Sequence, residues 1–324
     1  MKLLLLLSGL AAVARGFQPN LRPFHRRRQL IVTRESSRNN SSDEKNDLEL
    51  SSLVTGRLPT SVDDQVRQCV QSIQLAAADG TVRHAIRLLL PVIGATDLDD
   101  WPGGARQMME AAAPMVEQIM AGLGILDLVA IQKVCLDTSD GVYAWMGQAE
   151  SAANDCVFVL LPTAECVKAI RSLDEQVGPK RNLVLVNPQW RRQSDFGGFF
   201  GIDESSARYA ESYQPTFSLT NLICEGESVR ILHNHNKPWR VYLREELVNG
   251  DVDWKILGEK PFTKTPLGEW NEQPRNRRDG GRLFDYGQPS YQEIIDMLNQ
   301  SPSYTPKSPA ERAAAAFAFI KDTL

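Results

Sequence analysis

The chain has 324 residues, of which 42% are hydrophobic and 23% charged, enough for one large domain or two small ones with a proper core. Residues 1–42 contain eight Lys and Arg and a single acidic residue, so the rest of the chain carries 28 basic and 39 acidic residues and a formal net charge of −11. This acidic balance argues against nucleic-acid binding through neutralisation of phosphates.

The first 42 residues have the composition of a two-part targeting leader. An apolar run from Leu3 to Val13 has the length of a secretory signal, and the small residues Ala14 and Gly16 occupy the positions that signal peptidase reads. Residues 17–42 are rich in Arg and Ser and poor in acids, which is typical of organelle transit segments. We predict a signal peptide at 1–16, a transit-like basic segment at 17–42 and a linker at 43–56.

The leader resembles the bipartite leaders of plastid proteins in diatoms and related algae, in which a Phe follows the signal-peptide cut as Phe17 does here. Arg15 and Gln18 depart from the small residues that usually surround that Phe. The resemblance implies a plastid location, in the stroma or at the periphery of the thylakoid. The alternative is a secreted protein with a basic segment after its signal. The five cysteines are scattered without paired spacing, which favours a reducing compartment over a disulfide framework.

No transmembrane segment is predicted in the mature chain. Asp127 interrupts its best apolar run, from Ile119 to Ala130, and that run is shorter than the roughly 20 residues that a membrane-spanning helix needs. Any contact with a membrane is therefore expected to be peripheral.

The structured part is predicted to begin with a helix over 62–77, because apolar residues recur there at helical spacing and Thr60 or Ser61 can cap it. A strand over 82–90 and a helix over 105–123, with a weak point at Pro114, come next. Further on, two continuous apolar runs, 156–161 and 182–187, flank an apolar stripe at helical spacing. This pattern is typical of a βαβ unit in a parallel sheet that is covered on both faces.

Four short strand-like runs follow a short helix near 204–211, and the turn Asn249-Gly250 is a strong hairpin signal. The fold class is therefore predicted as α/β, three-layer, with a mostly parallel sheet that contains a βαβ unit and an antiparallel hairpin or meander at the sheet edge. The domain is expected to cover 57–300. Capping boxes at Ser290 and Ser308 predict two final helices, the second within a C-terminal linker and helix over 301–324.

Two segments are candidates for ligand binding, although the chain lacks the phosphate-loop, dinucleotide, GxSxG and HExxH motifs. The first is the helix start with Trp101, Gly103, Gly104 and Arg106, where free N–H groups attract anions and Gly permits close approach. Its alternative is a helix capped by the preceding acids. The second is Asn187 and Trp190 at the carboxyl end of a parallel strand, where open α/β sheets bind ligands. Its alternative is a strand-terminating turn.

The remaining candidates carry weaker chemistry. His233 and His235 lie on one side of a strand, but metal binding needs further ligands, and a surface strand end beside a turn explains the pair as well. His84 has the same two explanations. No metal, cofactor or catalytic residue is assigned. A basic cluster consists of Arg275, Arg277, Arg278 and Arg282. It is expected either to contact an acidic partner or anionic lipid headgroups, or to form a solvated loop.

Five segments, taken together and in their order along the chain, resemble an uncharacterised domain of unknown function that occurs in cyanobacteria, algae and plant chloroplasts. The resemblance covers roughly 57–300, while His233, His235 and the Arg-rich part of 260–289 lie outside the family pattern. The segments are Leu58-Pro59-Thr60-Ser61, Ala78-Asp79-Gly80, Asp97 to Gly104, Val184 to Pro188 and Lys237 to Tyr242.

That family includes chloroplast proteins required for photosystem II accumulation, and one copy is fused to a chloroplast adenylate kinase. The resemblance implies a non-enzymatic plastid accessory role, with photosystem II subunits or assembly factors as partners. A second hypothesis is an enzyme that binds a small molecule or nucleotide in the crevice at the carboxyl ends of the parallel strands. A third is a secreted interaction protein.

A reporter fusion tests the leader. Residues 1–50 fused to a fluorescent protein are expected to direct it to the plastid of an alga with secondary plastids, because both targeting signals are then present. Fluorescence in the medium would instead establish the secreted alternative.

Overall fold

The computed structural model describes residues 57–90, 104–125, 127–139, 141–149, 155–190, 193–198, 201–247, 249–263, 287–302 and 304–315. The chain divides into the units Met1–Lys45 and Asn46–Leu324, and every described residue belongs to the second. The predicted leader and linker lie outside the described residues, as do Trp101, Gly103 and the four arginines of the basic cluster.

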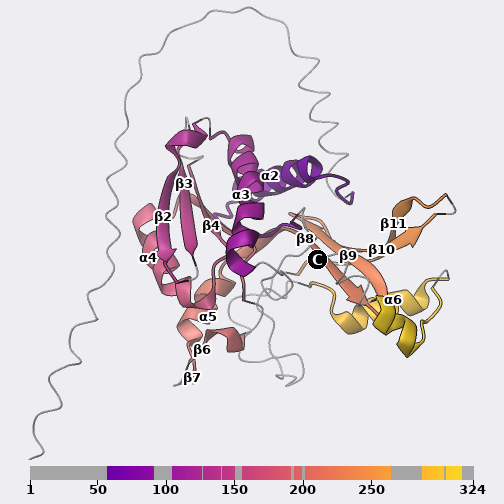
Figure 1. Ribbon diagram of the computed structural model, residues 1–324. Helices are drawn as coiled ribbons and strands as arrows, with labels where there is room; N and C mark the ends of the chain where they lie inside the picture. The colour runs from indigo at the N-terminus through magenta and orange to yellow at the C-terminus, as the bar shows by residue number, and fades with distance from the viewer. Residues whose placement is uncertain are drawn as a thin grey trace, which may run out of the picture. The chain divides into compact units, whose positions relative to one another are not determined.

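A nine-stranded sheet forms the centre of the described chain, with the strand order β11-β10-β9-β8-β1-β5-β4-β3-β2 (Figure 1). Two further strands, β6 (Gly197–Gly198) and β7 (Gly201–Ile202), pair only with each other. The strands of the large sheet are β1 (Arg83–Arg87), β2 (Gln132–Asp137), β3 (Val142–Gly147), β4 (Cys156–Leu160), β5 (Asn182–Val186), β8 (Gln214–Cys224), β9 (Glu227–Asn234), β10 (Trp239–Glu246) and β11 (Val252–Lys260).

The sheet is mixed, so the prediction of a mostly parallel sheet is wrong in its proportions. Strand β1 pairs in parallel with both β5 and β8, and β5 pairs in parallel with β4. Every other neighbouring pair in the sheet is antiparallel. The short connection from β2 to β3 permits only a hairpin, which makes that edge antiparallel. The predicted antiparallel meander, β8 to β11, is confirmed at the other edge.

Five α-helices, α2 to α6, have defined first and last residues in the described part of the chain. Ser61 caps α2 through a hydrogen bond from the Asp64 N–H, and α3 continues through Pro114 without a break. Short 3-10 helices cover Leu128–Ala130, Ala164–Cys166 and Gln193–Phe196. The α-helices are α2 (Val62–Ala78), α3 (Gly104–Gly122), α4 (Val167–Val177), α5 (Glu204–Glu211) and α6 (Tyr291–Gln300).

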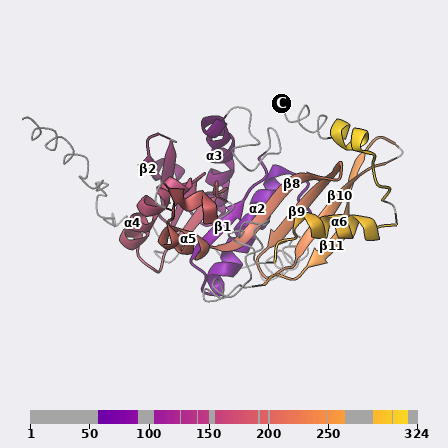
Figure 2. The ribbon, with the colours of Figure 1, turned by 90° about the horizontal axis from the view of Figure 1, so that it is seen from below.

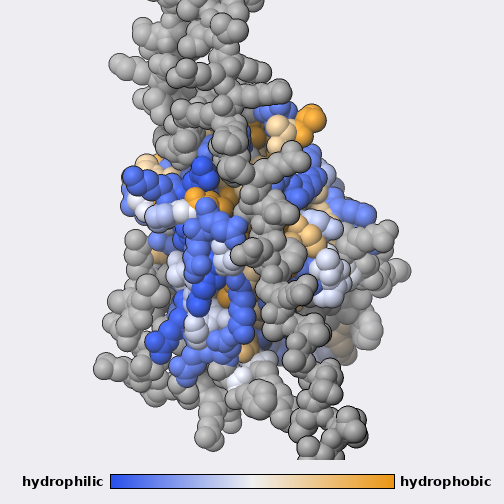
Figure 3. Space-filling view, turned by 90° about the vertical axis from the view of Figure 1, so that its left-hand side faces the viewer, coloured by the Kyte–Doolittle hydropathy of each residue, from blue (hydrophilic) through white to orange (hydrophobic). Residues whose placement is uncertain are grey.

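Helices cover both faces of the sheet in its β9–β10 part. Leu232 of β9 packs in one core cluster with residues of α2 and α3, whereas its neighbour Ile231 packs in another with Ile294 of α6. Successive strand residues point to opposite faces, so α2 and α3 lie against one face and α6 against the other (Figure 2). The described residues visible in Figure 3 are mostly hydrophilic, with smaller hydrophobic areas among them.

Strands β4 and β5 are parallel neighbours, and α4 lies between them in the sequence. Every residue of β4 is buried, as the continuous apolar run predicts. Cys156 and Cys166 are buried and form no disulfide within the described chain. Burial raises the pKa of the Cys156 thiol to about 12, so this thiol is not a reactive nucleophile.

The predicted capping boxes are both present. Ser290 and Glu293 exchange side-chain and backbone hydrogen bonds at the start of α6, and Ser308 and Glu311 do the same. Within the part of the chain that the structure describes, no helix is both long and apolar enough to cross a membrane.

Candidate functional site

Asn187 joins the carboxyl ends of β1 and β5. Its side chain is buried, and its backbone is left-handed with φ of 46°. The Asn187 N–H donates to the Ile86 carbonyl at 2.9 Å. Its Oδ1 accepts from the Leu88 N–H at 2.6 Å, and its Nδ2 donates to the Leu88 carbonyl at 2.9 Å. The amide predicted to bind a ligand therefore completes the hydrogen bonds of the backbone beyond β1.

A second amide repeats this arrangement one residue further on. Gln65 of α2 accepts from the Leu89 N–H at 2.8 Å and donates to the Leu89 carbonyl at 2.9 Å. Residues 88 and 89 have left the sheet, so these two buried side chains satisfy backbone groups that strand pairing no longer serves. The path of the chain at this edge is thus fixed by side chains from α2 and from the end of β5.

Trp190 lies in the core beside this edge. Its ring is fully buried and tilted against Phe196, with 5.6 Å between the centroids, and its backbone carbonyl accepts from Arg87 at 3.4 Å. The indole Nε1 has no hydrogen-bond partner among the described residues. Of the other predicted ligand residues, Gly104 begins α3 with φ of 73°, and the side chain of Arg106 is not described.

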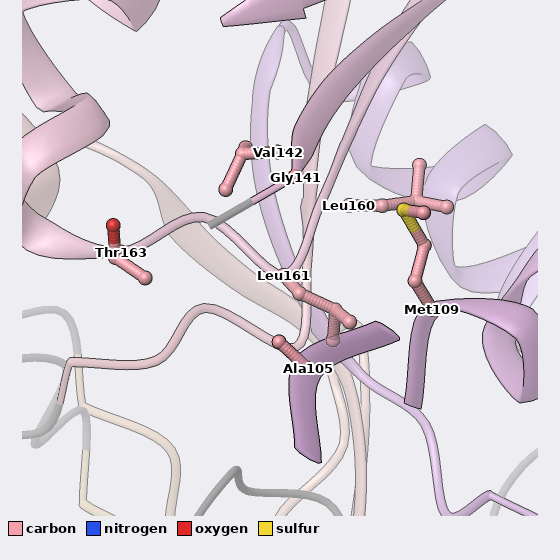
Figure 4. Close-up of a pocket in the computed structure, with 7 residues that line it drawn as sticks. All are labelled: Ala105, Met109, Gly141, Val142, Leu160, Leu161 and Thr163. Atoms are coloured by element: carbon pink, nitrogen blue, oxygen red, sulfur yellow. The ribbon is translucent and has the colours of Figure 1, made fainter. Parts of the chain in front are cut away.

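A cavity of about 170 Å³ opens at the carboxyl end of β4 (Figure 4). Its lining comes from the end of β4, the start of β3 and the first turns of α3, and Figure 4 shows Leu161 beside Ala105 and Leu160 beside Met109. The Thr163 hydroxyl is the one polar side-chain group in this lining. The described lining suits a small apolar group and presents no acid or base; it consists of Ala105, Met109, Gly141, Val142, Leu160, Leu161 and Thr163.

The three candidate histidines are buried, so the expectation that His233 and His235 form a surface strand end is wrong. The His233 ring is stacked between Trp239 and Phe262, with centroid distances of 4.5 and 4.7 Å. Burial lowers its pKa to about 4. Neither ring nitrogen of His233 makes a hydrogen bond of normal geometry within the described chain. The nearby backbone of Pro215 and of Lys237 raises the pKa slightly and so opposes part of the effect of burial.

The other two histidines hold separate polar contacts. The Nε2 of His235 lies 2.8 Å from Oδ2 of Asp79, the C-cap of α2. His84 lies between Thr216 and Asn182, at 3.0 and 3.2 Å, and burial lowers its pKa to about 4. The described residues include no group of three or more His, Cys, Asp or Glu that could hold a metal ion. His84 thus connects β1 with β5 and β8, and His235, directly after β9, contacts the C-cap of α2.

A network that the sequence does not reveal lies beside β1. Arg83 forms an ion pair with Asp174 of α4, and the Tyr209 hydroxyl donates to Asp174 at 2.9 Å. Tyr209 and Tyr213 share a further hydrogen bond at 2.9 Å. The pairs are separated by 35 or more positions, except for the two tyrosines, so no local motif signals them. The network joins α4 and α5 to the central strand.

The fold and these contacts define an α/β protein with a mixed sheet. Two side-chain amides bond the backbone just beyond the carboxyl end of its central strand, β1. A family model described as "Domain of unknown function (DUF1995)" matches residues 59–266, a range that contains all nine strands of the large sheet. The chain belongs to this family. No curated protein and no solved structure matches it.

Asn187→Ala tests the bracing of the sheet edge. Removal of the amide leaves the Leu88 N–H and carbonyl unpaired inside the protein and places Ala in left-handed backbone. We expect the free energy of unfolding to fall by about 2–4 kcal/mol, measured by urea denaturation. Asn236→Ala is the matched control, because Asn236 is also left-handed, with φ of 61°, but is exposed. Equal losses in the two variants would contradict a special role for Asn187.

His233→Phe tests the effect of the buried imidazole on pH dependence. The folded pKa, about 4, lies below the unfolded value of 6.5, so the unfolded chain binds more protons between these values and stability falls as pH falls through this window. Phe keeps the aromatic stack without a titratable group. The loss of stability between pH 7 and pH 5 is expected to shrink by about 1–2 kcal/mol.

Urea denaturation at the two pH values measures this difference. Phe262→Leu serves as the control, because it changes the stack but keeps the imidazole and hence most of the pH dependence. A His233→Phe variant with the same pH dependence as the unmodified protein would show that other groups cause the loss.

Proposed function

We propose that this chain is a non-enzymatic plastid accessory protein that assists the assembly or accumulation of photosystem II. The observation that carries the non-enzymatic part is the use of Asn187: both halves of its amide bond the Leu88 backbone, at the sheet edge where ligands of α/β proteins are usually bound. The side chain best placed to orient a polar substrate there is thus committed to the fold.

The plastid part of the proposal rests on the leader and on the family. The Arg-rich segment 17–42 after a secretory signal supports entry into a plastid of secondary origin, followed by release in the stroma or at the thylakoid surface. The link to photosystem II rests on the resemblance to chloroplast proteins needed for its accumulation, and the match over residues 59–266 supports that resemblance.

We also propose how the helices are distributed over the two faces of the sheet. The protein is three-layered, with α2 and α3 on one face of the sheet and α4, α5 and α6 on the other, and β4, α4 and β5 form a right-handed βαβ unit. The parallel pairing of β4 with β5 and the division of the core into separate clusters support this arrangement. Such a body presents rigid surfaces for partner proteins, and the basic cluster 275–282 supplies contact with an acidic partner or with lipid headgroups.

A second candidate function is the binding of a small apolar molecule in the cavity beside β4. The observation in its favour is the described lining, which is apolar apart from one hydroxyl, over about 170 Å³. Ala105→Leu would narrow this cavity, and loss of a co-purifying apolar compound from this variant would support the candidate.

Capture from plastids tests the leading proposal. The tagged chain, isolated from gently solubilised plastids, is expected to bring down photosystem II subunits or assembly factors that are absent from a tag-only control. A variant with Gln in place of Arg275, Arg277, Arg278 and Arg282 is expected to recover less of these proteins, because the charge contact is lost.

A null mutant provides the independent readout. Its photosystem II content is expected to fall and assembly intermediates to accumulate. Normal content together with normal intermediates would overturn the proposal, whatever proteins the tagged chain captures.

A further inference from the structure

Strand β11 is the outermost strand of the large sheet on the side of the meander (Figure 1). It is nine residues long and pairs on its inner side with β10. No described element pairs with its outer side. Exposed edges of this length offer unpaired backbone groups to another strand, and proteins usually shorten, cover or charge them.

Apolar side chains lie along this edge. Val252 and Ile256 are 45% and 52% exposed, and Leu247, at the turn that leads into β11, is 44% exposed. Val252, Trp254 and Ile256 occupy alternate positions and share one face of the strand. Trp254 is half-buried beneath the Arg230 guanidinium, 4.1 Å from its ring centroid. The face of β11 beside the edge is therefore apolar and only partly covered.

The backbone of the same residues points outward. The Leu247 N–H donates to the Asp251 carbonyl at 2.8 Å, which makes this a hydrogen-bonded pair of the hairpin. Such pairs alternate, so Asp253 and Lys255 direct their backbone groups to β10, and the intervening residues direct theirs outward. In agreement, the Trp254 N–H donates to the neighbouring Asp253 carboxylate at 2.8 Å and not to a strand.

For a second, antiparallel copy of β11, four of the five registers centred on residues 252 to 256 set like charges against each other. A two-fold axis at Asp253 or at Lys255 opposes that residue with itself. An axis at Val252 opposes Asp251 with Asp253, and an axis at Ile256 opposes Asp253 with Glu259. Like charges directly opposite one another destabilise strand pairing.

Among the registers centred on residues 252 to 256, the one with the axis at Trp254 is complementary. Asp253 then faces Lys255 of the second copy, and Val252 faces Ile256 of the second copy. Each of these pairs occurs twice, because the contact is symmetric. In this register the Trp254 N–H exchanges the Asp253 carboxylate for the carbonyl of the second Trp254, and the two residues form the hydrogen-bonded pair that the alternation in the hairpin requires.

We propose that β11 pairs antiparallel with β11 of a second copy of this chain, with Trp254 on the two-fold axis and Asp253 opposite Lys255. The contact closes on itself and yields a dimer with one continuous sheet through both copies. The paired stretch is short, so the dimer is reversible and forms at micromolar concentrations. The inference is independent of the proposed function.

Charge reversal and charge exchange test the register. The mass of the full chain in solution, measured by light scattering over a range of concentrations, is expected to rise from 36.1 kDa towards twice that value. Lys255→Asp and Asp253→Lys each place like charges opposite one another twice, and each is expected to weaken the dimer at least about tenfold. The variant with both substitutions restores opposite charges and is expected to recover dimerisation to within about threefold.

Lys168→Asp is the matched control, since its side chain is 84% exposed on α4 and is not part of β11, and it is expected to leave the dimer unchanged. Circular dichroism and thermal unfolding establish that each variant is folded. A chain that stays monomeric at high micromolar concentration, a dimer insensitive to either single reversal, or an exchange variant that fails to recover would each overturn the proposal.

Discussion

The parallel pairing of β1 with both β5 and β8 is the constraint on which the rest of the structure depends. Strand β1 comes first in the chain but lies at the junction between the β2–β5 half of the sheet and the β8–β11 meander. Each half needs β1 to cover its inner edge, and unpaired edges are costly or adhesive. The two halves therefore form one sheet, although each consists largely of contacts that are local in the chain.

Polar side chains inside the protein hold this junction at both ends of β1. Asn187 and Gln65 bond the backbone where the chain leaves the sheet at residues 88 and 89, and His84 bonds Thr216 of β8 at the opposite end. Buried polar groups are tolerated where they are paired, and here the amides of Asn187 and Gln65 replace strand pairing. This use explains why an edge that binds ligands in many α/β proteins presents an apolar cavity in its described part.

The two outer parts of the sheet solve the edge problem differently. At the β2 edge, Lys133 lies over the Trp145 ring, 3.9 Å from its centroid, and most side chains are half-buried. At the β11 edge, Val252 and Ile256 remain exposed between charges of both signs. In the proposed dimer, the charges of β11 favour the register centred on Trp254 over its immediate neighbours, which would give specificity as well as attraction.

The sequence by itself determined the local elements, because period, capping and turn chemistry act over a few residues. Helix α5 has the predicted bounds 204–211, Ser61 and Ser290 cap as expected, and the runs at β4 and β5 are buried strands. Only the tertiary structure decided that the sheet is mixed, that Asn187 turns inward to Leu88 and that His233 is enclosed between Trp239 and Phe262. These features join residues far apart in the chain, so their partners depend on how the strands are ordered, and no local pattern encodes that order.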